Sequence, residues 1–169
     1  MVERAISDEE AWEVLEPHWR LVTERFERKG FDVDGFGRLV IDSSAHDSCR
    51  HFAKTYTDAS EVMLAPEMVH LPVPSIQAIM AHELGHVVDV SRPGYCWYRK
   101  GALVILPELP SKGLRKLLRQ WQERSDDEVE RVADAIAEVA MGQKIGYVGS
   151  SSCLVECLGK GKARPKGLR

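Results

Sequence analysis

Two histidines stand one helical turn apart in the run His82-Glu83-Leu84-Gly85-His86, and this spacing constrains the chain more than any other feature of its sequence. The surrounding stretch from Ser75 to Val90 has no internal proline and is mostly apolar, which predicts an α-helix. Residues four apart on a helix differ by only about 40° in direction, so both imidazoles can reach one cation. Zinc accepts imidazole nitrogens, and Glu83, about 100° further round the helix, can take a proton from a zinc-bound water. The motif therefore predicts the core of a zinc-hydrolase site.

The predicted helix is apolar on most of its surface, which indicates that it is largely buried. Buried imidazoles need partners, and a metal ion is one such partner. The alternative is a pair of core histidines hydrogen-bonded to backbone groups or carboxylates. Asp89 lies three residues after His86 on the same face. One helix cannot easily place three ligands round one ion, so we expect Asp89 to support a ligand rather than to bind the metal.

Length and composition predict an ordinary globular domain. The chain has 169 residues, 44% of them hydrophobic and 29% charged, which is enough for one core. We expect a single domain over residues 1–158 and a basic, mobile tail over 159–169. The net charge of −3 argues against a dedicated nucleic-acid binder. No apolar run approaches the roughly 20 residues of a membrane span, and no signal peptide is visible, so we expect no membrane partner and a cytoplasmic location.

Local signals predict a mixed α+β fold. The sequences Ser7-Asp8-Glu9-Glu10 and Ser125-Asp126-Asp127-Glu128 are capping boxes, which predict one helix up to Gly30 and another up to about Met141. A short helix is expected after Ser111. Strand composition is found at Arg38–Asp42, around His51–Tyr56 and at Glu61–Ala65, while residues 95–106 fit a helix or a strand equally well.

A third ligand is expected on the helix after Ser125. Glu130 and Asp134 lie one turn apart at the border of its apolar face, beside the small residues Ala133 and Ala137. Like charges at this spacing repel each other, and the repulsion grows when they are desolvated. A cation bound by Glu130 and an imidazole hydrogen-bonded to Asp134 would turn this repulsion into a net stabilisation. Asp134 would then orient a zinc-bound histidine through its other ring nitrogen. A solvated acidic strip is the alternative.

The two motifs together resemble those of the gluzincin metallopeptidases. The chain has His-Glu-Leu-Gly-His followed, on a later helix, by Glu130-x-x-Ala133-Asp134, and its small size is similar to that of the minigluzincins and the ImmA/IrrE-type peptidases. The resemblance implies a zincin-like fold, a cytoplasmic zinc peptidase, Glu130 as third ligand, and Asp134 as support for a histidine. It also implies that Glu61–Ala65 forms the edge of the substrate cleft. The chain departs from the ImmA/IrrE pattern in its long interval between His86 and Glu130 and in the segment that follows Asp134.

We therefore expect a zinc metallopeptidase that acts on a peptide or protein substrate, with Glu83 as general base and His82, His86 and Glu130 as ligands. A donor to the oxyanion should also exist, and the candidates are Tyr147, Tyr95, His70 and His51. One alternative is a metal-bearing binding or regulatory module without turnover. Another is a structural zinc site, which the presence of Glu83 and the scarcity of suitable cysteines disfavour.

Overall fold

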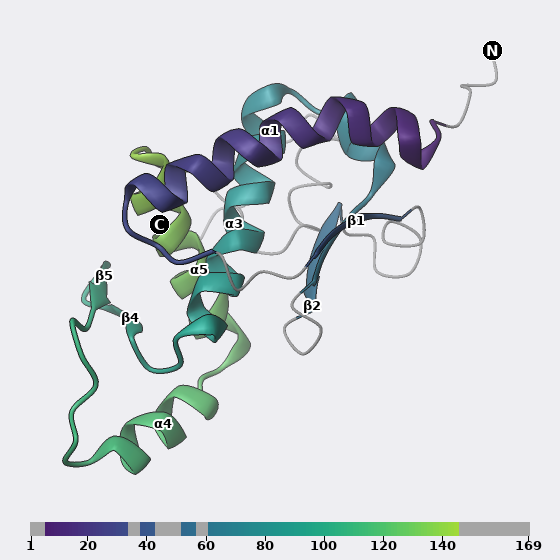
Figure 1. Ribbon diagram of the computed structural model, residues 1–169. Coiled ribbons are helices and arrows are strands. Elements are labelled where there is room, and N and C mark those ends of the chain that lie inside the picture. Colours follow the sequence, from purple (N-terminus) through teal and green to yellow (C-terminus); the bar gives the residue numbers. More distant parts are fainter. Residues whose placement is uncertain (1–5, 34–37, 43–51, 57–60, 146–169) are drawn as a thin grey trace.

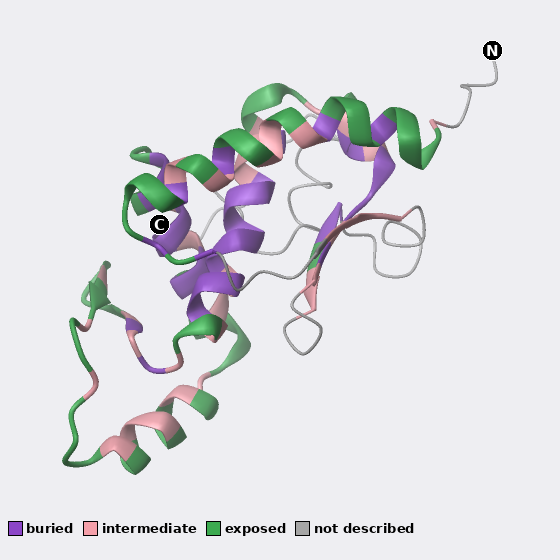
Figure 2. Ribbon diagram, viewed as in Figure 1, coloured by how far each residue is buried: buried purple, intermediate pink, exposed green. Residues whose placement is uncertain are grey.

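Two helices form the centre of the molecule, α3 (Val73–Ser91) and α5 (Asp126–Met141). In the computed structural model they pack against each other, and α1 (Asp8–Arg28) lies across α3 (Figure 1). The structure describes residues 6–33, 38–42, 52–56 and 61–145. Figure 2 shows that burial concentrates on α3, where even His82, Glu83 and Asp89 are buried. The central helix is therefore enclosed, as its apolar sequence predicts.

The two capping boxes predicted from the sequence are confirmed. Ser7 accepts from the backbone N–H of Glu10, whose side chain accepts from the backbone of Ser7, and Ser125 and Glu128 make the same reciprocal pair. Each box satisfies N–H groups that a helix start leaves free. Because α5 begins at a fixed residue, the positions that face α3 from its second turn are also fixed.

Three short strands make a sheet with the order β1-β3-β2: β1 (Arg38–Ile41), β2 (Ala53–Tyr56) and β3 (Glu61–Leu64). β3 pairs with β1 in parallel and with β2 antiparallel. The 3₁₀-helix η1 (Pro66–His70) then leads from β3 into α3. Pro74 lies in the first turn of α3, where its missing N–H costs no hydrogen bond.

The segment Glu61–Ala65, expected at the edge of the substrate cleft, contains the central strand of the sheet, so a peptide cannot add to it as a further strand. β3 has a partner strand on both sides, so its backbone groups are used inside the sheet. The strand that packs against α3 at the outer edge is β2. Among the residues that the structure describes, β2 pairs with β3 alone.

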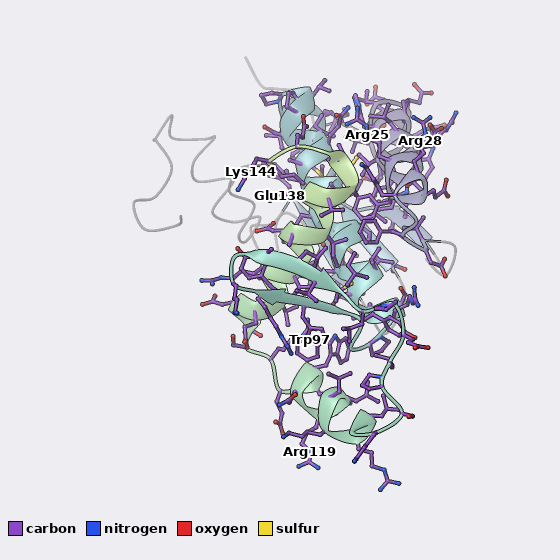
Figure 3. The ribbon with its side chains drawn as sticks, turned by 90° about the vertical axis from the view of Figure 1, so that its left-hand side faces the viewer. Arg25, Arg28, Trp97, Arg119, Glu138 and Lys144 are labelled. Atoms are coloured by element: carbon purple, nitrogen blue, oxygen red, sulfur yellow. The ribbon has the colours of Figure 1, made fainter. Side chains whose placement is uncertain are left out.

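A smaller lobe follows α3 in the chain and projects from the central helices (Figure 1). It consists of the hairpin β4 (Cys96–Arg99) and β5 (Ala102–Ile105), then α4 (Leu114–Gln122). The segment 95–106, which fits a helix or a strand equally well in the sequence, forms this hairpin. The sequence could not decide between them because aromatic and β-branched residues also occur in buried helices. Trp97 points from the hairpin toward α4 (Figure 3).

The described part of the chain has a mixed α+β architecture, as predicted. None of the helices in the described ranges is both long enough and apolar enough to cross a bilayer. The division into a domain over 1–158 and a tail over 159–169 stays a prediction, because residues 146–169 lie outside the described part.

Candidate metal centre

α3 presents the side chains of His82 and His86 in the same direction, as four-residue spacing requires. Their Nε2 atoms lie 3.1 Å apart, and the two rings are almost perpendicular, at 88°. His82 is buried, and the side chain of His86 is 14% exposed. Two imidazole nitrogens therefore converge on one point at the surface of α3 that faces α5.

α5 brings Glu130 to the same point. Its Oε2 lies 3.0 Å from Nε2 of His82, and its Oε1 lies 3.4 Å from Nε2 of His86. One ligand atom from each of these three residues lies within 4.8 Å of the others. The sequence prediction that Glu130 joins the two histidines is thus met in space, and the group could hold a metal ion.

The donor separations can be compared with those around a small tetrahedral ion. Ligands at 2.0–2.1 Å from a tetrahedral zinc lie about 3.3 Å from one another. The 3.1 Å between the two Nε2 atoms and the 3.0 Å from Nε2 of His82 to Oε2 of Glu130 are close to this value, whereas the 3.4 Å contact of His86 is with the other oxygen, Oε1. No fourth histidine, cysteine or carboxylate from the described residues joins the cluster.

Asp134 orients His82, as predicted. Its Oδ1 lies 2.7 Å from Nδ1 of His82. A carboxylate at this nitrogen favours the tautomer that carries its proton on Nδ1, because an ionised carboxylate only accepts. Nε2 of His82 is then free to bind an ion, and the hydrogen bond raises the basicity of the ring.

The same contacts shift two pKa values when no ion is bound. Burial alone lowers the pKa of His82, but hydrogen bonds to Asp134 and Glu130 outweigh it and raise the pKa to about 10. Burial alone raises the pKa of Glu130. Hydrogen bonds to His82 and His86 outweigh burial, so the pKa lies below its usual value. A proton on His82 therefore occupies the position that a cation would take.

Glu83 is buried beside this cluster, and a residue that the sequence analysis missed holds its carboxylate. The hydroxyl of Thr55, on β2, lies 2.5 Å from Oε2 of Glu83 and 3.2 Å from its backbone carbonyl oxygen. A hydroxyl carries one proton, and the shorter distance assigns it to the carboxylate. The register of β2 places Thr55 opposite the buried Val62, so its side chain lies on the sheet face toward α3. Only that alternation within His51–Tyr56 could have indicated Thr55 in advance.

Close approach of the two helices depends on Gly85. A Cβ atom at this position would overlap the backbone of Ala133 on α5. The absence of a side chain lets α5 come near enough for the carboxylate of Glu130 to reach both histidines. Gly85 therefore sets how closely the two helices can pack.

Asp89 does not support a histidine directly, which corrects the expectation from the helical wheel. Its carboxylate binds Arg124 at 2.6 Å and the indole N–H of Trp121 at 3.2 Å. The wheel places Asp89 on the right face, but the helix has risen by about 4.5 Å beyond His86 at that point. Arg124 and Trp121, from the segment before α5, meet it there.

Two of the four proposed oxyanion donors, His70 and Tyr95, lie in the described part of the chain, and neither is a member of the cluster. His70 is exposed at the end of η1, and nine residues of α3, about 13.5 Å of helix, separate Val73 from His82. Tyr95 is half-buried against Arg92, whose guanidinium lies 4.0 Å from the ring centre. Tyr147 and His51 lie outside the described residues.

Comparisons of the chain with protein-family models, with curated proteins and with solved structures found no match. The geometry of the cluster must therefore carry the functional argument.

Proposed function

We propose that the chain is a zinc metallopeptidase with a zincin-like, gluzincin-type site formed by His82, His86 and Glu130. The observation that carries the proposal is the position of Glu83, a buried carboxylate next in sequence to one ligand and fixed by Thr55. A structural metal site would have no use for such a base. A ligand set of two imidazoles and one carboxylate is typical of catalytic zinc.

When bound, zinc would polarise the carbonyl of the scissile bond and make water at the site more acidic. The remaining chemistry falls to residues of the chain. Glu83 accepts a proton from the attacking water and delivers it to the leaving nitrogen. Thr55 donates to Oε2 of Glu83, which leaves Oε1 as the atom that exchanges the proton. Asp134 keeps His82 in one orientation throughout.

The substrate would bind in an extended conformation along β2. Phe52 accepts from the backbone N–H of Ala65 at 2.7 Å, which makes this residue pair a hydrogen-bonded one in the ladder with β3. Hydrogen-bonded and non-bonded pairs alternate along an antiparallel pair, so the backbone groups of Thr55 point away from β3. A peptide that adds at this side would pair with Thr55, the residue that holds Glu83.

Glu83→Gln tests the function directly. The amide keeps the shape of the side chain but cannot accept a proton. We expect wild-type zinc content and unfolding behaviour, with turnover reduced about 10²–10⁴-fold. Zinc-loaded wild type and variant would be compared by mass spectrometry on a proteome-derived peptide library. Equal cleavage by both proteins would contradict the peptidase mechanism and would favour a binding module instead.

A further inference from the structure

Asp89 carries a negative charge in the interior, three residues beyond His86 on α3. The residue is 1% exposed. Its Oδ2 accepts from Nη2 of Arg124 at 2.6 Å, and its Oδ1 accepts from Nη1 of Arg124 at 3.3 Å and from Nε1 of Trp121 at 3.2 Å. Both carboxylate oxygens therefore have donors, as a charge at this depth requires.

Arg124 is held as firmly as its partner. Its side chain is 6% exposed, and Nε donates to the backbone carbonyl of Trp121 at 2.9 Å. The guanidinium lies 4.9 Å from the ring centre of Trp121 and 6.0 Å from that of Trp97. A planar group with these contacts has a single orientation available. Asp89 is thereby linked to Arg124, the residue that directly precedes Ser125.

Ser125 is the N-cap of α5, so the pair ties α3 to the start of the helix that carries Glu130 and Asp134. Another tie between the helices is the contact of Gly85 with Ala133. Glu130 lies between these two ties in the sequence of α5. A helix fixed at two points can neither slide along its neighbour nor turn about its own axis.

We propose that Asp89 and Arg124 are positioning residues of the metal site, which set α5 so that Glu130 meets His82 and His86 and Asp134 meets Nδ1 of His82. The pair touches none of these side chains and acts through the start of the helix. The proposal requires that the cluster binds a metal ion, and it is independent of peptide hydrolysis. A buried ion pair with a purely structural role would affect the stability of the fold but not the affinity for the ion.

The affinity for Zn²⁺ separates these two roles. It would be measured by competition with a chromophoric chelator, at a temperature where circular dichroism shows every protein fully folded. Asp89→Asn keeps the shape of the side chain and removes its charge, and Arg124→Lys keeps the charge and removes the planar fork. We expect each change to weaken zinc binding about 10–100-fold, the effect usual for residues that orient metal ligands. The absorption spectrum of bound Co²⁺ should change as well, because the position of the Glu130 oxygen changes.

Leu15→Ala is the matched control. Leu15 is fully buried on α1, so its truncation lowers the melting temperature at a residue that belongs neither to the ion pair nor to the cluster. We expect its zinc affinity and cobalt spectrum to equal those of wild type. The double variant Asp89→Leu with Arg124→Met removes both charges, and such apolar replacements often restore stability. It should melt higher than Asp89→Asn and still bind zinc weakly.

Wild-type zinc affinity and an unchanged cobalt spectrum in Asp89→Asn or in the double variant would overturn the positioning role. A loss of affinity in Leu15→Ala equal to that in Asp89→Asn would overturn it too, because affinity would then follow stability. Absence of zinc binding by wild type would remove the metal site itself. A wild-type protein that binds zinc but cleaves no peptide would count against the proposed function alone.

Discussion

Gly85 on α3 and Ala133 on α5 meet backbone to backbone: a Cβ atom at Gly85 would lie 2.9 Å from both the Cα and the carbonyl carbon of Ala133. Backbone atoms of a packed helix cannot move aside as the end of a flexible side chain can. The separation of α3 and α5, and with it the reach of Glu130 to the histidines, therefore depends on this one glycine.

Gly85→Ala should lower the free energy of unfolding by about 1–3 kcal/mol, the usual cost of overpacking. Alanine gains roughly 1 kcal/mol in intrinsic helix propensity over glycine, so a net loss would come from the clash alone. Zinc affinity should fall as well, because the added methyl group pushes α5 away. Urea unfolding of the metal-free protein and zinc titration would measure both. An equally stable variant with wild-type affinity would contradict the close approach of the helices.

His82→Ala should abolish tight zinc binding and the stabilisation that zinc brings. At a free zinc concentration of 100 times Kd, binding stabilises the wild-type fold by about 2.7 kcal/mol. The melting temperature of wild type should therefore rise with zinc and fall again with a chelator, whereas that of His82→Ala should not respond. His70→Ala is the matched control, since His70 is exposed on η1 and is not a member of the cluster. An equal response to zinc in His82→Ala would refute the ligand assignment.

Asp134→Asn should weaken zinc binding about 10–100-fold while the fold persists. The amide can still accept from Nδ1 of His82 but offers no charge to increase the basicity of the ring. Asp127→Asn makes the same chemical change at an exposed position in the first turn of α5 and should leave the affinity unchanged. Equal affinities for the two variants, measured by chelator competition, would argue that Asp134 does not orient the ligand.

Zinc binding should release a proton at neutral pH. The hydrogen bonds of His82 to Asp134 and Glu130 outweigh its burial and hold its pKa at about 10 when no ion is bound, so a proton occupies the ring at pH 7. An ion can bind only the neutral imidazole, and the affinity should therefore rise about tenfold per pH unit while one proton is displaced. Isothermal titration in two buffers of different ionisation enthalpy would count the proton. An enthalpy independent of the buffer would contradict the raised pKa.

The same shift predicts how the stability of the metal-free protein depends on pH. The pKa of His82 is raised from 6.5 to about 10, so its stabilising contribution is complete below pH 6.5 and is lost as the pH rises toward 10. The pKa of Glu130 is lowered from 4.5, so its contribution is complete above pH 4.5 and is lost on further acidification. Stability from this pair should therefore be greatest between these limits, and urea unfolding across the range would show it.

The parts of the site that the sequence predicts are those fixed by local rules. Helical spacing places His82 beside His86 and Glu130 beside Asp134, and a capping box fixes where α5 begins. These relations hold over one or two turns, so they can be read from a single stretch of chain. The burial of α3 follows in the same way from its apolar composition.

The parts that the sequence does not predict depend on pairing between distant segments. A four-residue run such as Glu61–Leu64 suits a central strand and an edge strand equally well, and only its partners β1 and β2 decide between them. On a helical wheel Asp89 lies on the same face as His86. In the folded chain its carboxylate binds Arg124, a residue 35 positions later in the sequence. Thr55 carries no recognisable motif, since its importance arises from the register of β2 against β3 and the position of α3.

Thr55→Val gives a specific test of the contact between β2 and the proposed general base. Valine keeps the shape of threonine but cannot donate to Glu83. A hydrogen bond to a charged group contributes about 1.5–3 kcal/mol, so kcat should fall about tenfold or more. Zinc content should not change, because Thr55 touches Glu83 and not the ligand cluster. Thr55→Ser restores the hydroxyl and should recover most of the activity.

The double variant shows whether Thr55 acts through Glu83. In the Glu83→Gln background the base is already absent, so Thr55→Val should cause little further loss if the hydroxyl serves only to orient that carboxylate. An additional tenfold loss in this background would assign the hydroxyl of Thr55 another task, such as a direct hydrogen bond to the substrate. Kinetics on one peptide from the library, with kcat and KM determined separately, would distinguish the two: loss of orientation lowers kcat, whereas loss of a substrate contact raises KM.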